Sequence, residues 1–187
     1  LVDAAHDQLG GLDLLVNNAG VGAIGPFADA DESRLRTVME VNFFAPLDLI
    51  RLAIPLLRVG RQPMIANVGS VLGHRAVPNK SEYCASKFAM HGFSDALRAE
   101  LSGAGIDVLL ISPSTTESEF FERVLDDHQP HAGRRRGMSP EEVARRTIRA
   151  VTRGRHEVIL SAGGVLLVWL DRLCPPLANR LIARFGS

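Results

Sequence analysis

The chain has 187 residues, of which 46% are hydrophobic and 5% aromatic, and this is enough material for one compact domain of ordinary soluble type. Its 21 basic side chains balance its 21 acidic ones, so net charge gives no support for a nucleic acid or a strongly acidic partner. The two cysteines, Cys84 and Cys174, lie far apart and match no metal-ligand spacing; no disulfide framework and no metal site is expected, and a cytoplasmic location fits best.

The first residues have the pattern of the end of an amphipathic helix. Leu1, Val2, Ala5 and Leu9 recur at helical spacing before the pair Gly10–Gly11, which is typical of a helix C-terminus. The sequence has no initiator methionine, no basic leader and no apolar stretch of the roughly 18 residues that span a bilayer. We therefore expect a chain that begins inside an element, with no signal peptide and no transmembrane helix.

Short apolar runs alternate with longer segments along the rest of the chain. Leu12–Asn17 is an apolar run that ends in polar and glycine residues, which predicts a strand buried on both faces of a parallel sheet. Further strands are expected at Met64–Val68, at Ile106–Ile111 and, more weakly, at Glu157–Leu160.

Helices are expected between these strands. Asp31–Arg58 is a helical stretch interrupted at Pro46 and Pro55, Ser81–Leu101 is a second, and a third begins after Ser139 as its N-cap. The alternation of strands and helices predicts an α/β fold: a doubly wound parallel sheet with helices on both faces and ligand sites at the carboxyl ends of the strands.

Tyr83 and Lys87 lie four residues apart near the start of the expected helix Ser81–Leu101, so both side chains leave the same face of that helix. A free phenol has a pKa near 10, and a neighbouring ammonium is expected to lower it. Tyr83 would then serve as a general acid or base at neutral pH. The pair alone is a weak signal, because Tyr and Lys fall four apart on many solvated helix faces.

Polar residues elsewhere strengthen this interpretation. Ser70 follows the strand Met64–Val68, where its hydroxyl could bond a substrate carbonyl oxygen. Asn17–Gly20 ends the first strand in the same way, and Asn42 stands inside a helical segment, where an amide is otherwise unfavourable. Each also has a purely structural interpretation, as a turn, a loop cap or a solvent-facing amide.

The order of these features resembles the short-chain dehydrogenase/reductase family. The family pattern of N-N-A-G, a helical Asn, a Ser after a strand and Y-x-x-x-K appears here as Asn17–Gly20, Asn42, Ser70 and the pair Tyr83 and Lys87. The serine stands 13 residues before the tyrosine, as the pattern requires, and the resemblance covers nearly the whole chain. It implies a Rossmann-like fold and an NAD(P)-dependent oxidoreductase that interconverts a secondary alcohol and a carbonyl.

The resemblance also implies a role for each residue. Tyr83 would exchange a proton with the substrate oxygen, Ser70 would polarise that oxygen, and Lys87 would hold the nicotinamide ribose and lower the pKa of Tyr83. Asn42 would anchor a water that links Lys87 to solvent. The expected catalytic residues are Asn42, Ser70, Tyr83 and Lys87, and the expected cofactor-binding residues are Asn17, Ala19, Gly20, Tyr83, Lys87, Pro113, Thr115 and Ser118.

Two segments depart from the family pattern. After the third strand the family has Pro-Gly and then a Thr at the nicotinamide carboxamide, whereas here Ser114 replaces the glycine after Pro113 and Ser118 stands where the Thr would be. The glycine-rich phosphate turn, and the residue that selects NAD or NADP, have no counterpart in the sequence. We therefore expect residues 1–187 to form a single partial domain that lacks the first strands of the family fold and exposes an edge of the sheet.

The C-terminal third contains a possible lid and a possible docking tail. Residues 115–138 stand where the family carries a substrate lid, so an apolar substrate is plausible, although their apolar side chains could simply pack the lid against the domain. Residues 165–187 form an amphipathic tail with Leu177, Leu181 and Phe185 on one face, which could lie on a membrane or at a subunit interface. We favour packing at an interface or in the core over a membrane, and we expect the complete protein to be a homo-oligomer.

Two other functions stay open at this point. A catalytically incompetent fragment that binds a partner or a membrane would explain the absent phosphate turn. A sugar-nucleotide epimerase shares the Tyr-x-x-x-Lys spacing, but the short stretch after Pro113 leaves little room for the larger substrate domain of such enzymes.

Overall fold

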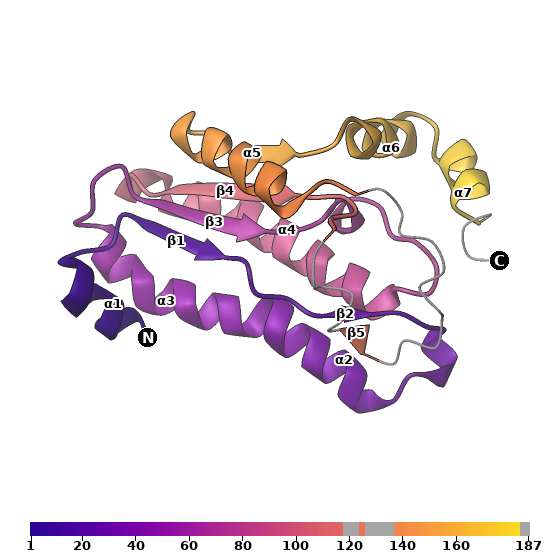
Figure 1. Cartoon of the computed structure of the whole chain (residues 1–187), viewed down its shortest axis with the longest axis horizontal. Coiled ribbons are helices and arrows are strands. Elements are labelled where there is room, and N and C mark those ends of the chain that lie inside the picture. The colour runs from indigo at the N-terminus through magenta and orange to yellow at the C-terminus, as the bar shows by residue number, and fades with distance from the viewer. Residues whose placement is uncertain (118–123, 126–136, 184–187) are drawn as a thin grey trace.

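The computed structural model describes residues 1–117, 124–125 and 137–183. Their main feature is a parallel sheet of four strands in the order β1-β3-β4-β6 (Figure 1). The α/β fold with a parallel sheet expected from the sequence is confirmed. The strands are β1 (Leu14–Asn17), β3 (Met64–Val68), β4 (Asp107–Ser112) and β6 (Glu157–Ile159).

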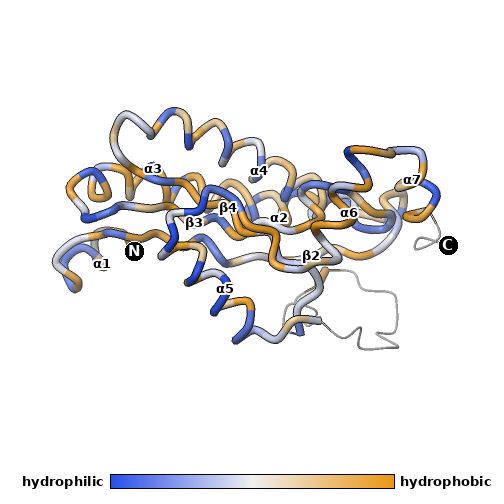
Figure 2. Tube along the Cα trace, turned by 90° about the horizontal axis from the view of Figure 1, so that it is seen from above, coloured by the Kyte–Doolittle hydropathy of each residue, from blue (hydrophilic) through white to orange (hydrophobic). Residues whose placement is uncertain are grey.

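Helices cover both faces of this sheet. Helices α3 and α4 lie on one face and α5 on the other (Figures 1 and 2). The helices are α1 (Val2–Leu9), α2 (Glu32–Met39), α3 (Ala45–Leu57), α4 (Ser81–Leu101), α5 (Pro140–Thr152), α6 (Ala162–Leu173) and α7 (Pro175–Ala183). Shorter elements are the strand β2 (Gly22–Ala23), which pairs with β5 (Val124–Leu125), the π-helical turn η2 (Glu40–Phe44) and the 3₁₀ turns η1 (Phe27–Asp29), η3 (Val71–Gly73) and η4 (Ser102–Ala104).

The core has two parts, because successive side chains of a strand point to opposite faces. Ile65 of β3 and Val108 of β4 belong to a cluster with residues of α3 and α4. Their neighbours Ala66 and Leu109 belong to a second cluster, which includes Ala150 of α5. Both faces of β3 and β4 are therefore sealed from water, and their near-continuous apolar sequences follow from that burial.

Local signals at the helix ends are confirmed. The Asp31 carboxylate accepts a hydrogen bond from the Arg34 amide at 2.8 Å at the start of α2, and the Ser139 hydroxyl accepts one from the Glu142 amide at 3.3 Å at the start of α5. Gly10, after α1, has a φ of 74°, a conformation that glycine adopts without steric cost.

The helical stretch Asp31–Arg58 is interrupted, but the expectation that the breaks lie at Pro46 and Pro55 is wrong. The α-helical pattern is broken at the π-helical turn Glu40–Phe44, before either proline. Pro46 lies in the first turn of α3, where a missing amide hydrogen costs nothing. Pro55 lies inside α3, which continues through it to Leu57.

Strand β1 is not buried on both faces, contrary to the expectation for Leu12–Asn17. It is an edge strand of the described sheet, and its Leu14 and Val16 side chains are 39% and 46% exposed. The apolar sequence of β1 is typical of a central strand. In this chain, however, β1 lies at the exposed edge of the sheet that the sequence also predicted.

No helix in residues 1–117 or 137–183 is both long and apolar enough to cross a membrane. The location of the protein stays a prediction.

Candidate active site

Tyr83 and Lys87 project from the first two turns of α4 toward the end of the sheet. The Lys87 ammonium lies 5.8 Å from the centroid of the Tyr83 ring. Lys87 is buried, and its nitrogen donates a hydrogen bond at 2.9 Å to the carbonyl oxygen of Val68, the last residue of β3. The cation is therefore held at the carboxyl end of a central strand, where α/β folds bind ligands.

Ser70 reaches the same place from the loop after β3. It is buried, its hydroxyl accepts a hydrogen bond from the Leu72 amide at 3.1 Å, and it hydrogen-bonds to the Tyr83 side chain. The following residue, Val71, donates its amide to the carbonyl oxygen of Pro113 at 2.9 Å. The structure thus brings together Ser70, Tyr83 and Lys87, as the sequence pattern predicts.

Burial controls the titration of both groups. It raises the pKa of Tyr83 to about 12, although the hydrogen bond with Ser70 acts in the opposite direction, because a buried phenolate loses its hydration. Burial also lowers the pKa of Lys87 to about 8. The expected lowering of the Tyr83 pKa is therefore not found, because desolvation outweighs the hydrogen bond with Ser70.

Asn42 is a buried residue of the π-helical turn between α2 and α3. Its side-chain oxygen accepts a hydrogen bond from the Val21 amide, and its nitrogen donates to the Val21 carbonyl, both at 2.9 Å. The same nitrogen donates to the Ser86 hydroxyl at 3.0 Å. π-helical turns are often found at functional sites. Through the hydrogen bonds of Asn42, this turn links the loop after β1 to α4. The solvent-facing alternative for Asn42 is therefore excluded.

Asn17 lies at the carboxyl end of β1 and is buried. It donates a hydrogen bond to Asn67 of β3 at 2.8 Å, and Asn67 donates to Ser94 of α4 at 3.0 Å. Its own oxygen is buried and has no hydrogen-bond partner within the described residues. Asn17 therefore stabilises the sheet, and its side-chain oxygen is left to accept a hydrogen bond from a further donor.

The remaining expected cofactor residues are more dispersed. Gly20 lies beside Asn42 and Lys87, whereas Ala19 is exposed in the loop after β1. Thr115 is exposed after β4, and its carbonyl oxygen accepts a hydrogen bond from the Met138 amide at 3.0 Å. Ser118 and the expected tail residue Phe185 lie outside the described residues, as do 119–123 and 126–136 of the expected lid.

Residues that no sequence motif marks also position this site. A Cβ at Gly73 would come within 2.7 Å of the Lys87 carbonyl oxygen, so only glycine lets η3 approach α4 so closely. Glu82, next to Tyr83, forms a buried ion pair with Arg34 at 2.6 Å. Gly73 stands 14 residues before Lys87, and Arg34 and Glu82 are 48 residues apart. No local sequence pattern therefore links the members of either pair.

With this geometry established, comparison with known proteins decides the family. A family model described as short chain dehydrogenase matches residues 1–129, which is more than half of the chain. The chain belongs to the short-chain dehydrogenase family. This confirms the resemblance drawn from Asn17–Gly20, Asn42, Ser70, Tyr83 and Lys87.

Named members of the family are similar over most of the chain. Dehydrogenase/reductase SDR family member 7B of Xenopus tropicalis is 36% identical over 173 residues, covering 89% of this chain and 56% of its own length. Ketoacyl reductase HetN of Nostoc is 28% identical over 193 residues, covering all of this chain and 66% of its own length. Retinol dehydrogenase 8 of Bos taurus is 37% identical over 119 residues, 64% of this chain and 38% of its own length.

Solved structures confirm the Rossmann-like fold. A short chain dehydrogenase from Burkholderia cenocepacia in complex with NADP superposes with a TM-score of 0.81 at 26% identity, over all of this chain and 73% of that one. A short chain dehydrogenase/reductase from Burkholderia phymatum in complex with NAD has a TM-score of 0.81 at 23% identity, over 94% of this chain and 70% of that one. The Xenopus tropicalis relative is matched over only 56% of its length, so the chain spans about half of that protein.

Proposed function

We propose that this chain forms the catalytic part of an NAD(P)-dependent oxidoreductase that interconverts a secondary alcohol and a carbonyl, with an apolar substrate. The observation that supports this most directly is the meeting of Ser70, Tyr83 and Lys87 at the carboxyl end of β3. The similarity to dehydrogenases and reductases supports the choice of reaction, and the NADP and NAD bound to the two Burkholderia proteins support the choice of cofactor.

The residues around Gly20 fit the nicotinamide-ribose part of such a cofactor. A Cβ at Gly20 would lie 3.2 Å from the Asn42 oxygen and 3.8 Å from the Lys87 nitrogen, so the absence of a side chain lets this loop pack close to both polar groups. The Lys87 ammonium has three donors, and one of them bonds to Val68. The other two suit the hydroxyls of a ribose, and the cofactor would be either NAD or NADP.

In reduction, Tyr83 would act as the general acid. Because its pKa is raised to about 12, its phenol holds its proton at neutral pH and can give it to the substrate oxygen. Ser70 would donate a hydrogen bond to the same oxygen and stabilise the charge that develops there. The bound nicotinamide supplies the hydride for reduction and accepts it in oxidation.

Lys87 and Asn42 would return the proton to Tyr83. The Lys87 pKa of about 8 lies near neutrality, so the ammonium can give up and regain a proton at low cost. Asn42 faces Lys87 across Gly20 and would hold a water between Lys87 and solvent. Asn17, Ala19, Pro113, Thr115 and Ser118 would complete the cofactor site.

Residues 115–138 would close over the substrate as a lid. The two ends of this segment are tied together, since Thr116 pairs with Met138 and the Glu117 amide donates to the Met138 carbonyl at 3.0 Å. Val124 and Leu125 pair with β2, which follows the Asn17–Gly20 loop. The lid is thereby attached next to the candidate active site.

Replacing Tyr83 by phenylalanine tests the proposed reaction. In the complete protein, supplied with NAD(P) and a panel of apolar ketones and secondary alcohols, Tyr83→Phe should lower kcat by a factor of roughly 10²–10⁴, the usual contribution of a general acid. The control variant Glu100→Gln changes an exposed side chain near the end of the same helix and should leave kcat unchanged. Turnover is followed by nicotinamide absorbance, and equal turnover of wild type and Tyr83→Phe excludes the proposal.

The alternative is a protein that binds a partner or a membrane without catalysis. The exposed apolar side chains of α6 and α7, which include Leu166, Trp169, Leu173 and Leu177, support a docking role for the tail. We propose that this surface serves a homo-oligomer of the enzyme, with contact to a membrane as the second possibility. Binding of NAD(P) by the protein, measured by calorimetry, would argue against a purely non-catalytic role.

A further inference from the structure

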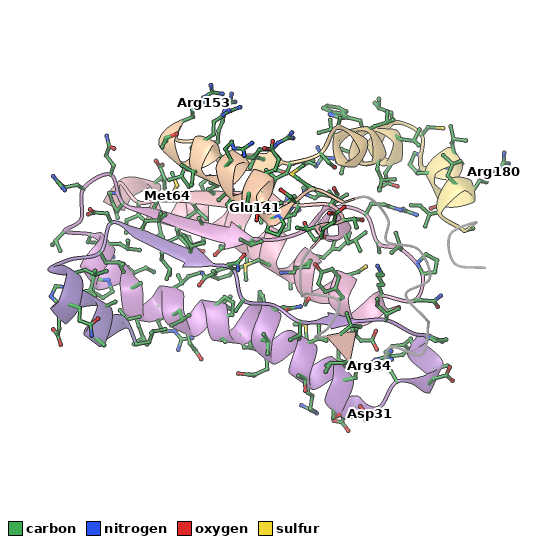
Figure 3. All side chains as sticks on the ribbon, viewed as in Figure 1. Asp31, Arg34, Met64, Glu141, Arg153 and Arg180 are labelled. Carbon is green, nitrogen blue, oxygen red and sulfur yellow. The ribbon has the colours of Figure 1, made fainter. Side chains whose placement is uncertain are left out.

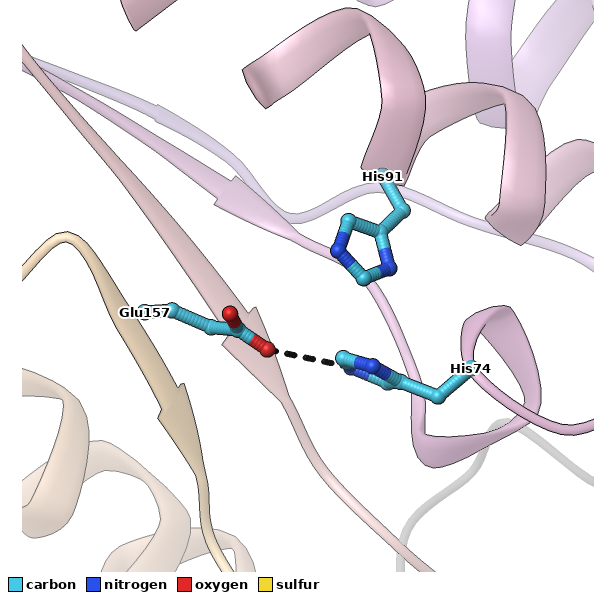
Figure 4. Close-up of side chains that lie close together, drawn as sticks. All are labelled: His74, His91 and Glu157. Carbon is cyan, nitrogen blue, oxygen red and sulfur yellow. Dashed lines mark ion pairs between the residues drawn. The ribbon is translucent and has the colours of Figure 1, made fainter. Parts of the chain in front are cut away.

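Three side chains from distant parts of the sequence converge beside the candidate active site. His74 ends the turn η3, His91 lies on α4 and Glu157 begins β6; their side chains point toward one another (Figure 4). One imidazole nitrogen of each histidine and one carboxylate oxygen lie within 4.8 Å of one another. None of the proposed catalytic steps uses these three residues.

Their spacing is close to that of metal ligands. Bonds of about 2.0–2.1 Å to nitrogen or oxygen place the ligand atoms of a tetrahedral zinc ion about 3.4 Å apart. The Glu157 oxygen and the His74 Nε2 atom are already 3.5 Å apart. The Glu157 side chain is 37% exposed, so it can adjust its position, and the open side leaves room for water as a fourth ligand.

The hydrogen bonding of His74 also indicates a missing partner. Its side chain is only 2% exposed, and its Nδ1 atom is buried without a hydrogen-bond partner within the described residues. Its other nitrogen lies 2.9 Å from the Ser112 hydroxyl. The nitrogen beside Glu157 is Nε2, so an ion would bind Nε2 in place of the Ser112 contact, and Nδ1 needs a separate partner.

Polar groups surround the His91 ring. Asp95 lies one helical turn after His91, with its carboxylate 3.4 Å from the His91 Nε2 atom, and the His91 Nδ1 atom lies 3.3 Å from the Gly73 carbonyl. Both contacts are long for hydrogen bonds, so the His91 ring can turn one nitrogen toward an ion at little cost. Carboxylate and carbonyl groups behind a ligating histidine are the usual outer partners of metal sites.

We propose that His74, His91 and Glu157 bind a divalent transition-metal ion, with Zn²⁺ as the ion of choice. Two imidazoles and one carboxylate suit zinc and its neighbours, whereas Mg²⁺ and Ca²⁺ prefer oxygen ligands alone. The ion would tie β6 to η3 and α4, the elements that hold Ser70 and Lys87. Its role is structural, because it fixes the walls of the candidate active site from outside.

Metal titration of the full, untagged chain tests this site. After treatment with a chelator, isothermal calorimetry should detect one Zn²⁺ per chain, and Co²⁺ should give the visible bands of a site with nitrogen and oxygen ligands. Loss of an outer partner weakens metal binding 10–100-fold, so loss of a ligand in His91→Ala or Glu157→Gln should weaken it by about 100-fold or more. His156→Ala, which removes an exposed histidine next to Glu157, should bind Zn²⁺ like wild type.

Three results would overturn the proposal. The first is wild-type protein that shows no saturable Zn²⁺ binding. The second is Glu157→Gln protein that binds Zn²⁺ as tightly as wild type; this variant keeps the size of an exposed side chain, and an unchanged metal-free melting curve shows that it folds. The third is binding of Mg²⁺ at the same site with equal affinity, which would contradict the choice of a transition metal.

Discussion

The chemistry of the candidate site at the residue scale is set by burial of a phenol and an ammonium next to each other. Burial favours the neutral form of each group, so the pKa of Tyr83 rises to about 12 and that of Lys87 falls to about 8. A phenol that keeps its proton at neutral pH has that proton to give in reduction. An amine that titrates near neutrality is suited to replace that proton.

The raised pKa of Tyr83 predicts an unusual ultraviolet titration. Tyr83 is the only tyrosine of the chain, so tyrosinate absorbance reports it alone. The folded chain should show almost no tyrosinate up to pH about 11, whereas the urea-unfolded chain should titrate near pH 10. A folded-state midpoint at or below pH 10 would show that Lys87 stabilises the phenolate after all.

The same shift has a consequence for stability. The folded chain binds more protons than the unfolded chain between pH 10 and 12, so the contribution of Tyr83 is complete below pH 10 and is lost as the pH rises through 12. Two units of pKa correspond to roughly 3 kcal/mol.

Ser70→Ala removes the contact that lowers the pKa of Tyr83, and it should move the tyrosinate midpoint further upward.

At the scale of elements, α4 is the platform of the site. It carries Tyr83 and Lys87, it receives η3 against its backbone at Lys87, and it is joined to α2 by the buried pair of Arg34 and Glu82. The position of α4 therefore determines the position of the chemistry, and contacts that fix α4 should matter more than similar contacts elsewhere.

The buried ion pair of Arg34 and Glu82 can be compared with an exposed ion pair on α2, the helix that carries Arg34. Arg34 and Glu82 have side chains 2% and 1% exposed, whereas Arg36 and Glu32 of α2 are 75% and 74% exposed. Arg34→Met leaves the Glu82 charge buried and unpaired, and should lower the free energy of unfolding by about 3–5 kcal/mol. Arg36→Met should change it by less than about 1 kcal/mol. Urea denaturation measures both, and equal effects would refute the special role of the buried pair.

Two glycines of neighbouring segments give a second matched comparison. A Cβ at Gly73 would meet the Lys87 carbonyl oxygen at 2.7 Å, whereas a Cβ at Gly92 of α4 would meet nothing within 4 Å. Gly73→Ala should destabilise the chain by about 1–3 kcal/mol, because η3 must move away from α4. Gly92→Ala should stabilise it by about 0.5–1 kcal/mol, since glycine is unfavourable inside a helix. Thermal melts decide the signs, and a stabilised Gly73→Ala variant would show that η3 is not tightly packed.

These elements also show what the sequence alone can predict. Periodicity and end signals predict β3 and α4, and the spacing of Tyr83 and Lys87 places both residues correctly, because these features depend on neighbours in the chain. The buried pair of Arg34 and Glu82 depends on tertiary contacts between distant segments. The cluster of His74, His91 and Glu157 does so too, and a single sequence carries no record of such contacts.

At the scale of the whole molecule, the tail helices α6 and α7 lie beyond the carboxyl ends of the sheet strands, at the end opposite to α1 (Figure 1). Arg75, after η3, anchors the tail through Asp171 at 2.8 Å and Asn179 at 2.5 Å. Its apolar residues are visible in Figure 2, while Arg180 points away from the body of the molecule in Figure 3. A tail fixed by specific polar contacts presents its apolar side chains in a defined arrangement, which favours a protein partner over a fluid membrane.

Trp169 provides the test of this surface. It is the only tryptophan of the chain and is 54% exposed, so its fluorescence reports whether the face that it shares with Leu166 and Leu173 is covered. We expect sedimentation velocity to show an oligomer whose dissociation on dilution shifts the Trp169 emission to longer wavelength. Leu166→Glu combined with Leu173→Glu places charges in the interface and should give a monomer with the long-wavelength emission at every concentration. A wild-type monomer whose Trp169 emission shifts to shorter wavelength only with anionic vesicles would refute the oligomer and support attachment to a membrane.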